Sequence, residues 1–192
     1  MTFRSLCSGL CFSLFALNAQ AGALDLKLNS KMAELVFLTE NATFGYGGAD
    51  IGMGVLSNEN NDLFLNGSIL VSGSGTGDMR ALHFGVGGKV YAGRLKMEPE
   101  NLEGGGIAIG ALVRYVFPAS TPLALLAEGY YAPPVTSFSD FDGMREFRVA
   151  VELEVTPSAR AYIGYRKLTT VLDSGAKYDV DDKAHVGVRF AF

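Results

Sequence analysis

Apolar and polar side chains alternate along most of this chain, and that alternation restricts its fold more than any other feature. In residues 145–155 every second side chain is apolar, and most of those between are charged. A period of two places the two kinds on opposite faces of a β-strand. The pattern recurs in residues 49–56, 63–71, 82–91, 107–117, 123–131, 161–168 and 184–192. These runs predict an all-β domain.

The segments between the runs indicate how the strands are connected. Proline avoids strand interiors because it cannot donate to a ladder, and all six prolines lie between runs or at the edge of one. Long polar segments at 92–106, 132–144 and 169–183 alternate with short ones at 118–122 and 156–160. Short periplasmic turns alternate with longer outer loops in membrane barrels. The sequence therefore predicts an eight-stranded antiparallel up-and-down transmembrane β-barrel.

A soluble, lipocalin-like barrel is the main alternative, with apolar side chains inside instead of outside. The mean hydropathy is high, +0.22, yet no uncharged apolar stretch reaches the roughly 18 residues of a spanning helix. At the usual rise and tilt, residues 145–155 span close to the apolar band of about 25 Å in an outer membrane. Tryptophan is absent, which removes the Gly-x-Trp of lipocalins. We therefore expect outer-membrane lipid around the barrel.

Aromatic residues fall at both ends of the expected lipid-facing side, as interfacial anchoring requires. The outer girdle comprises Tyr131, Phe147 and Tyr165, and the inner one Tyr115, Phe117, Phe190 and Phe192. The alternating carboxy-terminal residues Val188, Phe190 and Phe192 resemble the terminal strand that the barrel-assembly machinery of Gram-negative bacteria recognises. We expect that machinery as a partner and a monomeric product. The net charge of −4 excludes a basic nucleic-acid binder.

The amino-terminal residues 1–21 have the layout of a cleaved signal peptide, with one early charge, an apolar stretch and a final Ala-x-Ala. A buried helix and a lipoprotein modified at Cys11 fit this segment less well. Residues 22–192 then form the barrel, without either cysteine. Residues 33–39 are ambiguous: they could be the first strand, its extension or a periplasmic segment. Adding them would give an odd strand number, which bacterial single-chain barrels avoid, so we expect eight strands.

Charged residues on the polar side of the runs predict an ion-paired interior, because buried charges require partners. The expected network comprises Asp50, Lys89, Arg114, Glu128, Glu146, Arg148, Glu152, Glu154, Arg160, Arg166 and Arg189, with Asn66, His83 and His185 on the same side. Eight strands leave room only for side chains. The alternatives are a narrow channel or small-ligand passage, and an enzyme acting on lipid or peptide through His185 with Asp181 or Asp182 at the outer rim. We assign no catalytic, metal or cofactor residues.

Several short motifs resemble the YfaZ family of small outer-membrane proteins. They are found in residues 51–54, 65–67, 86–91, 128–133, 163–166 and 186–192. Glu-Gly-Tyr-Tyr-Ala-Pro at 128–133 and Gly-Tyr-Arg at 164–166 are the most distinctive of them. The resemblance covers residues 49–192 and implies an outer-membrane barrel, but it brings no catalytic residues. Separately, we expect a structural or surface-interaction role in the cell envelope, with the outer loops at 132–144 and 169–183 available for contacts. Residues 22–43 depart from the family pattern.

Overall fold

A computed structural model of the chain describes residues 22–41, 49–98, 100–118 and 122–192. The expected signal peptide lies outside these residues. The strands are β1 (Gly22–Leu28), β2 (Met32–Asn41), β3 (Ala49–Asn58), β4 (Leu63–Ser74), β5 (Leu82–Leu95), β6 (Leu102–Val116), β7 (Leu123–Ala132), β8 (Ser137–Ser139), β9 (Phe141–Thr156), β10 (Ala159–Leu172) and β11 (Lys177–Ala191). Two short 3₁₀ helices, η2 (Gly77–Met79) and η3 (Pro134–Thr136), lie in the connections.

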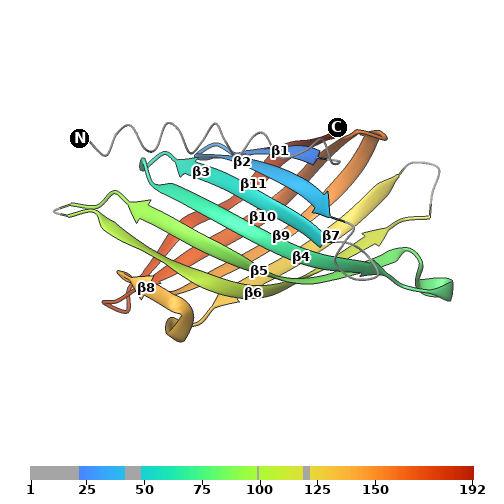
Figure 1. The fold of residues 1–192 in the computed structure, drawn as a ribbon. Helices are drawn as coiled ribbons and strands as arrows, with labels where there is room; N and C mark the ends of the chain where they lie inside the picture. The colour runs from blue at the N-terminus through green and yellow to red at the C-terminus, as the bar shows by residue number, and fades with distance from the viewer. Residues whose placement is uncertain (1–21, 42–48, 99, 119–121) are drawn as a thin grey trace, which may run out of the picture.

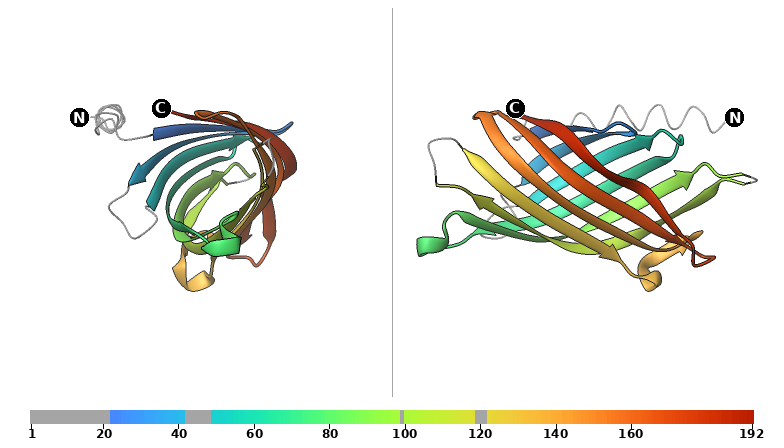
Figure 2. Two further views of the ribbon diagram at one scale, coloured as in Figure 1. Left: turned by 90° about the vertical axis from the view of Figure 1, so that its right-hand side faces the viewer. Right: turned by 180° about the vertical axis from the view of Figure 1, so that it is seen from behind.

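Ten of these strands close into an antiparallel barrel, and β8 lies outside it against β6 (Figure 1). The barrel order follows the chain, with β7 pairing directly with β9 and with β1 closing the ring on β11. The expected antiparallel closed barrel is therefore confirmed, but the expected number of eight strands is wrong. Seen from one end, the sheet curves round to meet itself (Figure 2).

The two additional strands come from the amino-terminal part of the barrel, which the sequence left unplaced. In β1, Leu24, Leu26 and Leu28 alternate with Asp25 and Lys27, and β2 contains the ambiguous residues 33–39. The two strands pair with each other over the whole of β1. The count rises by two, so the barrel keeps the even strand number that bacterial single-chain barrels favour.

The barrel has two different ends. At the terminal end, Gly22 and Phe192 exchange backbone hydrogen bonds of 2.9 and 2.8 Å, and the β4–β5, β6–β7 and β9–β10 connections lie there. At the distal end, to the left in Figure 1, lie the β1–β2, β3–β4, β5–β6 and β10–β11 connections and the segment between β7 and β9, with η3 and β8. No helix within the described residues is long and apolar enough to cross a membrane.

Strands extend further at the distal end than the alternation predicted. The segments 92–106, 132–144 and 169–183, expected as long loops, are largely occupied by β5, β6, β9, β10 and β11. At this end the outward side chains are often charged, as at Arg94 and Glu103, where Nη2 and Oε1 are 2.5 Å apart. The inward side chains belong mainly to an apolar cluster that includes Leu95. The outward apolar positions that mark the lipid-facing part of each strand therefore end before the strand does.

The outward face of the barrel is apolar between its two ends. Large apolar side chains such as Met53, Ile109 and Val151 are exposed there. Within the described strands, outward charges occur only near the distal end, at Arg94, Glu103, Asp142, Arg145, Lys167, Lys177, Asp179 and Asp182. This arrangement is the inverse of a soluble barrel, whose charges would cover the whole outer face.

The inward face divides into two layers. Near the distal end it is filled by an apolar cluster from nine strands, in which the rings of Phe64 and Phe141 stack with centroids 6.1 Å apart. Its other buried members are Met32, Leu56, Tyr91, Leu95, Ala108, Tyr130, Ala132, Met144, Leu168, Leu172 and Val180. Between this cluster and the terminal end, the inward side chains are mainly charged. The apolar cluster therefore separates the charged layer from the distal end.

Candidate functional site

The charged layer is built around Arg166, the largest of the fully buried side chains. Its Nη1 lies 2.6 Å from Oε2 of Glu34 and 3.6 Å from Oε1 of Glu146, and its Nε donates to Oδ2 of Asp181 at 2.9 Å. These partners come from β2, β9 and β11. β10 and β2 are not neighbours in the sheet, so Arg166 and Glu34 can meet only inside the barrel. The contact therefore identifies the face of these strands that points inward.

Two lysines complete this central cluster. Lys27 Nζ lies 2.6 Å from Glu34, and Lys89 Nζ lies 2.7 Å from Glu146. Tyr91 also donates a hydrogen bond to Glu146, and Asn66 donates to Oε1 of Glu34 at 3.2 Å. The central cluster, defined as Lys27, Glu34, Lys89, Glu146, Arg166 and Asp181, therefore has three cations and three anions. Its formal charges cancel, which is the condition for burying ions at low cost.

A second group of charges lies nearer the terminal end. Asp25 accepts hydrogen bonds from Nε and Nη2 of Arg189 at 2.8 and 2.5 Å, and another from the hydroxyl of Tyr162. Glu152 lies 2.7 Å from Nε of Arg114 and 3.7 Å from Nη1 of Arg160. The group is completed by Glu128 and Arg148, whose closest atoms are 3.3 Å apart.

Among the described residues, three interior side chains have buried polar atoms without a hydrogen-bond partner. They are Arg148, at Nε and Nη2, Arg160, at Nε, and His185, at both ring nitrogens. Arg148 lies over the ring of Tyr162, 5.1 Å from its centroid, and the His185 ring meets the same tyrosine edge-on at 5.9 Å. A buried donor without an acceptor is unfavourable. These atoms are therefore the places where the interior is incomplete.

A cavity of about 120 Å³ lies beside these charges, in the half of the barrel toward the terminal end. Its lining includes the charged residues Asp25, Lys27, Glu34, Asp50, Lys89, Glu128, Arg148 and Arg189. Apolar side chains from the same part of the barrel also line it, namely Val36, Leu38, Leu70, Leu112 and Leu126.

The distal end is closed by a polar network above the apolar cluster. Asp62 is fully buried and accepts hydrogen bonds from Asn58 at 2.9 Å, from the backbone of Lys96 at 2.8 Å and from Tyr178 at 2.6 Å. Burial and the hydrogen bond to Asp62 raise the pKa of Tyr178 above its usual value. The contacts tie the β3–β4 and β5–β6 connections to β11.

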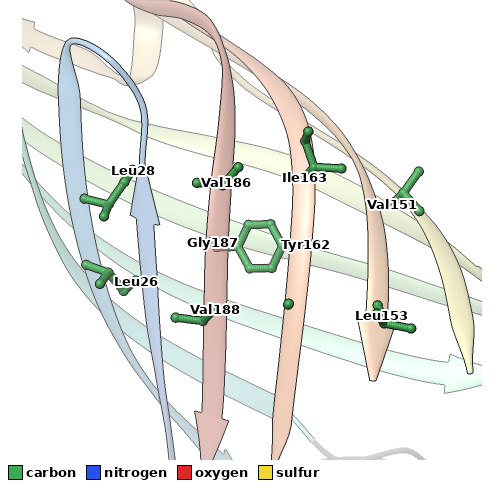
Figure 3. A pocket seen from close by; sticks show the side chains of 10 residues that line it. Leu26, Leu28, Val151, Leu153, Tyr162, Ile163, Val186, Gly187 and Val188 are labelled. Carbon is green, nitrogen blue, oxygen red and sulfur yellow. The ribbon is translucent and has the colours of Figure 1, made fainter. Parts of the chain in front are cut away.

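An apolar groove of about 480 Å³ lies on the outward face, over β1, β9, β10 and β11 (Figure 3). Leu26, Leu28, Val151, Ile163 and Val186 are among the side chains around it, and they contribute no charge. The groove lies within the apolar part of the outer face.

The structure brings most of the sequence-predicted interior residues together. Asn66, Lys89, Arg114, Glu128, Glu146, Arg148, Glu152, Arg160, Arg166 and Arg189 take part in the contacts above, and Asp50 lines the cavity. Glu154 is exposed on the same face. His83 lies at the terminal end and shares a 2.9 Å hydrogen bond with Ser74. Sequence reasoning missed Asp25, Lys27 and Glu34, because the strands that hold them were not identified.

The expected position of His185 at the outer rim is wrong. Its side chain is buried inside the barrel and is only 2% exposed. Asp181 is held by Arg166 and by the Nδ2 of Asn29 at 2.9 Å, whereas Asp182 faces outward beside Lys167 and Tyr165. Histidine and acid therefore do not form an exposed pair. Among the described residues, no group of His, Asp and Glu is arranged to hold a metal ion.

The aromatic residues expected at the lipid surface point outward. Tyr131, Phe147 and Tyr165 are exposed toward the distal end, and Arg145 lies 5.5 Å from the ring centroid of Tyr131. Tyr115 and Phe117 are exposed toward the terminal end, where their rings meet edge-on with centroids 5.1 Å apart. Phe190 and Phe192 are exposed there too, and Phe192 lies 6.3 Å from the ring of Phe37.

A protein-family model described as "YfaZ precursor" matches residues 1–192, the whole of the chain. No curated protein matches the sequence.

Proposed function

The chain belongs to the YfaZ family, and from this premise and the barrel we propose that it is a small protein of the Gram-negative outer membrane. The signal peptide would end at Ala21, so that the exported chain begins with the first residue of β1. The observation that carries the proposal is the outward face, which is apolar between two rows of aromatic residues and charged only near the distal end.

We propose that the terminal end faces the periplasm and the distal end faces outside. The outward charges at the distal end then lie above the lipid, and Tyr131, Phe147 and Tyr165 lie at its outer boundary. The carboxy-terminal strand ends with Val188, Phe190 and Phe192 outward, where the assembly machinery could bind it in the periplasm. We propose that the protein is a monomer and that outer-membrane lipid surrounds it.

We further propose that the barrel does not conduct and has a structural or surface-interaction role in the envelope. The apolar cluster around Phe64 and Phe141 fills the interior near the distal end, and Asp62 ties the connections above it together. The charges on the periplasmic side are mostly engaged in ion pairs. The surface available to other molecules is then the rigid distal end, with Arg94, Glu103, Lys167 and Asp182.

Three measurements test the proposal. Fractionation should recover the protein in the outer membrane, and the folded barrel should migrate differently on a gel before and after boiling. Planar-bilayer recordings on the folded protein should show no steps above detergent controls. A chain that stays soluble without detergent would overturn the membrane assignment, whereas reproducible conductance steps would replace the closed barrel with the narrow channel.

A further inference from the structure

The connection between β7 and β9 differs in composition from the other connections at the distal end. Its residues 133–139, here called the η3–β8 segment, contain no charged side chain. Each of the other distal connections contains at least one, such as Lys31, Glu59, Lys96 or Asp173. Val135 is 89% exposed, more than any other large apolar side chain in the described part of the chain, and Phe138 is 49% exposed. Exposed apolar side chains that lie close together indicate a binding surface.

The η3–β8 segment is held against the outer side of the barrel wall. β8 pairs with residues 104–106 of β6, and a Cβ on Gly105 would lie 2.6 Å from Cζ of Phe138. The hydroxyl of Thr136 donates a hydrogen bond of 2.7 Å to the carbonyl oxygen of Ile107. Seen along the barrel, the segment projects outside the ring of strands (Figure 2, left). Its exposed side chains therefore lie beside the wall.

The segment continues the apolar outer face. Ile107 and Ile109 are the next outward side chains of β6 toward the middle of the barrel, and both are exposed. Ile109 pairs with Tyr131, which belongs to the aromatic row toward the distal end. Aromatic rows of this kind mark the boundary between lipid and water. Val135 and Phe138 are thus placed at the edge of the proposed lipid layer.

A cation lies beside the same aromatic row. Arg145 is exposed on the outward face of β9, where it pairs with Tyr131 and lies 5.5 Å from the centroid of its ring. The outward cations Arg94 and Lys167 form ion pairs, whereas Arg145 has no acidic partner among the described residues. η3 lies against β9, the strand that holds Arg145. A guanidinium near an apolar surface matches a lipid, in which a phosphate lies above acyl chains.

We propose that the η3–β8 segment is a lipid anchor, in which Val135 and Phe138 insert among the acyl chains of the outer leaflet and Arg145 binds a lipid phosphate. The inference rests on the proposed membrane location, with the distal end facing outside. Because η3 and β8 lie on one side of the barrel, lipid would be held more firmly there than around the rest of the wall.

Fluorescence quenching by brominated lipids tests the insertion. The full chain with Cys7→Ser and Cys11→Ser receives one bimane label, at Val135→Cys, and is folded into vesicles of phosphatidylcholine and phosphatidylglycerol with brominated acyl chains. We expect the label to be quenched several-fold more than one at Ser174→Cys, which is exposed in the β10–β11 connection. A label at Val151→Cys, outward in the middle of β9, is the control for lipid contact.

The Val151 label separates the two proposals. If it is quenched and the label at residue 135 is not, the segment faces water and the anchor is wrong, while the membrane assignment is retained. If neither label is quenched, the membrane assignment is wrong and the anchor with it.

The phosphate contact is tested by lipid preference at the same label. In mixed vesicles with only one lipid brominated, phosphatidylglycerol should quench the Val135→Cys label more than phosphatidylcholine does, because a cation attracts the anionic lipid. Arg145→Gln should reduce this preference several-fold. Arg80→Gln removes the same charge from an exposed position at the terminal end and should leave the preference unchanged. An unchanged preference in Arg145→Gln would overturn the assignment of Arg145 to a lipid phosphate.

Discussion

Arg166 on β10 and Glu34 on β2 meet across the barrel interior with 2.6 Å between Nη1 and Oε2, although β11 and β1 lie between their strands in the sheet. Backbone pairing fixes each strand only to its two neighbours. A contact across several strands also fixes the barrel's cross-section. The central cluster therefore acts as a brace, by which we mean that it links strands of the barrel that do not pair with each other.

Removing the positive charge of Arg166 should lower the stability of the barrel. Arg166→Leu leaves Glu34, Glu146 and Asp181 buried without their shared cation. We expect the free energy of unfolding to fall by about 3–5 kcal/mol, measured by urea titration of the barrel in micelles. Arg94→Leu removes a cation whose pair with Glu103 is exposed on both sides, and it should cost under about 1 kcal/mol. Equal losses would show that the central cluster is not a brace.

His185 should be replaceable by an apolar residue. Its ring nitrogens are buried without partners, so they contribute no hydrogen bond and incur the cost of lost hydration. We expect His185→Leu to leave the unfolding midpoint unchanged or to raise stability by about 1–2 kcal/mol. The same urea titration measures it, with Arg166→Leu as the destabilised reference. A loss comparable to that reference would mean that the imidazole has a partner the protein needs.

Gly187 is required by its contact with Tyr162. A Cβ at this position would lie 2.2 Å from Cζ of the tyrosine, whose hydroxyl binds Asp25. We expect Gly187→Ala to destabilise the barrel by about 1–3 kcal/mol, because the ring must move and its hydrogen bond is disturbed. At Gly88 the nearest atom to a new Cβ is a carbonyl oxygen at 3.5 Å, an ordinary contact. Gly88→Ala is therefore the control, and a matching loss there would remove the steric explanation.

The outward face can be tested with a charge at two depths. Val151 lies outward in the middle of β9, and Asp142 is exposed at the distal end of the same strand. In lipid vesicles, Val151→Arg should lower the free energy of unfolding by about 2–4 kcal/mol, and Asp142→Arg by at most about 1 kcal/mol. If water surrounded the barrel, Val151→Arg would be tolerated and would improve solubility, contrary to the membrane assignment.

The barrel could be predicted from the sequence, but its first two strands could not be placed. Leu24, Leu26 and Leu28 alternate as clearly with Asp25 and Lys27 as any later run, yet β1 is only 7 residues long and directly follows the expected signal peptide. Bacterial single-chain barrels do favour even strand numbers, but the amino-terminal region contributes two strands and not the single one expected at residues 33–39. Outward apolar positions also end before the strands do, which concealed the distal parts of β5, β6, β10 and β11.

Most of the interior charges could be identified from the sequence, whereas their partners could not. Alternation places Arg166 and Glu146 on the inward side, but the partner of each depends on how far neighbouring strands are shifted along one another. That shift is a property of the closed barrel. The sequence also could not predict that Nε and Nη2 of Arg148 have no hydrogen-bond partner. That depends on which arginine the neighbouring Asp25 binds, and in the structure it binds Arg189.

The hydrogen bonds between Gly22 and Phe192 join the last strand to the first and make the wall a ring. Because the strands form a closed ring, a circular permutant could be made. Its chain would be opened at the Pro157–Ser158 turn, and a short linker would join residue 192 to residue 22. The order of strands would then change while every pairing stayed the same. Phe192 would no longer end the chain in such a variant, and β1 would still pair with β11.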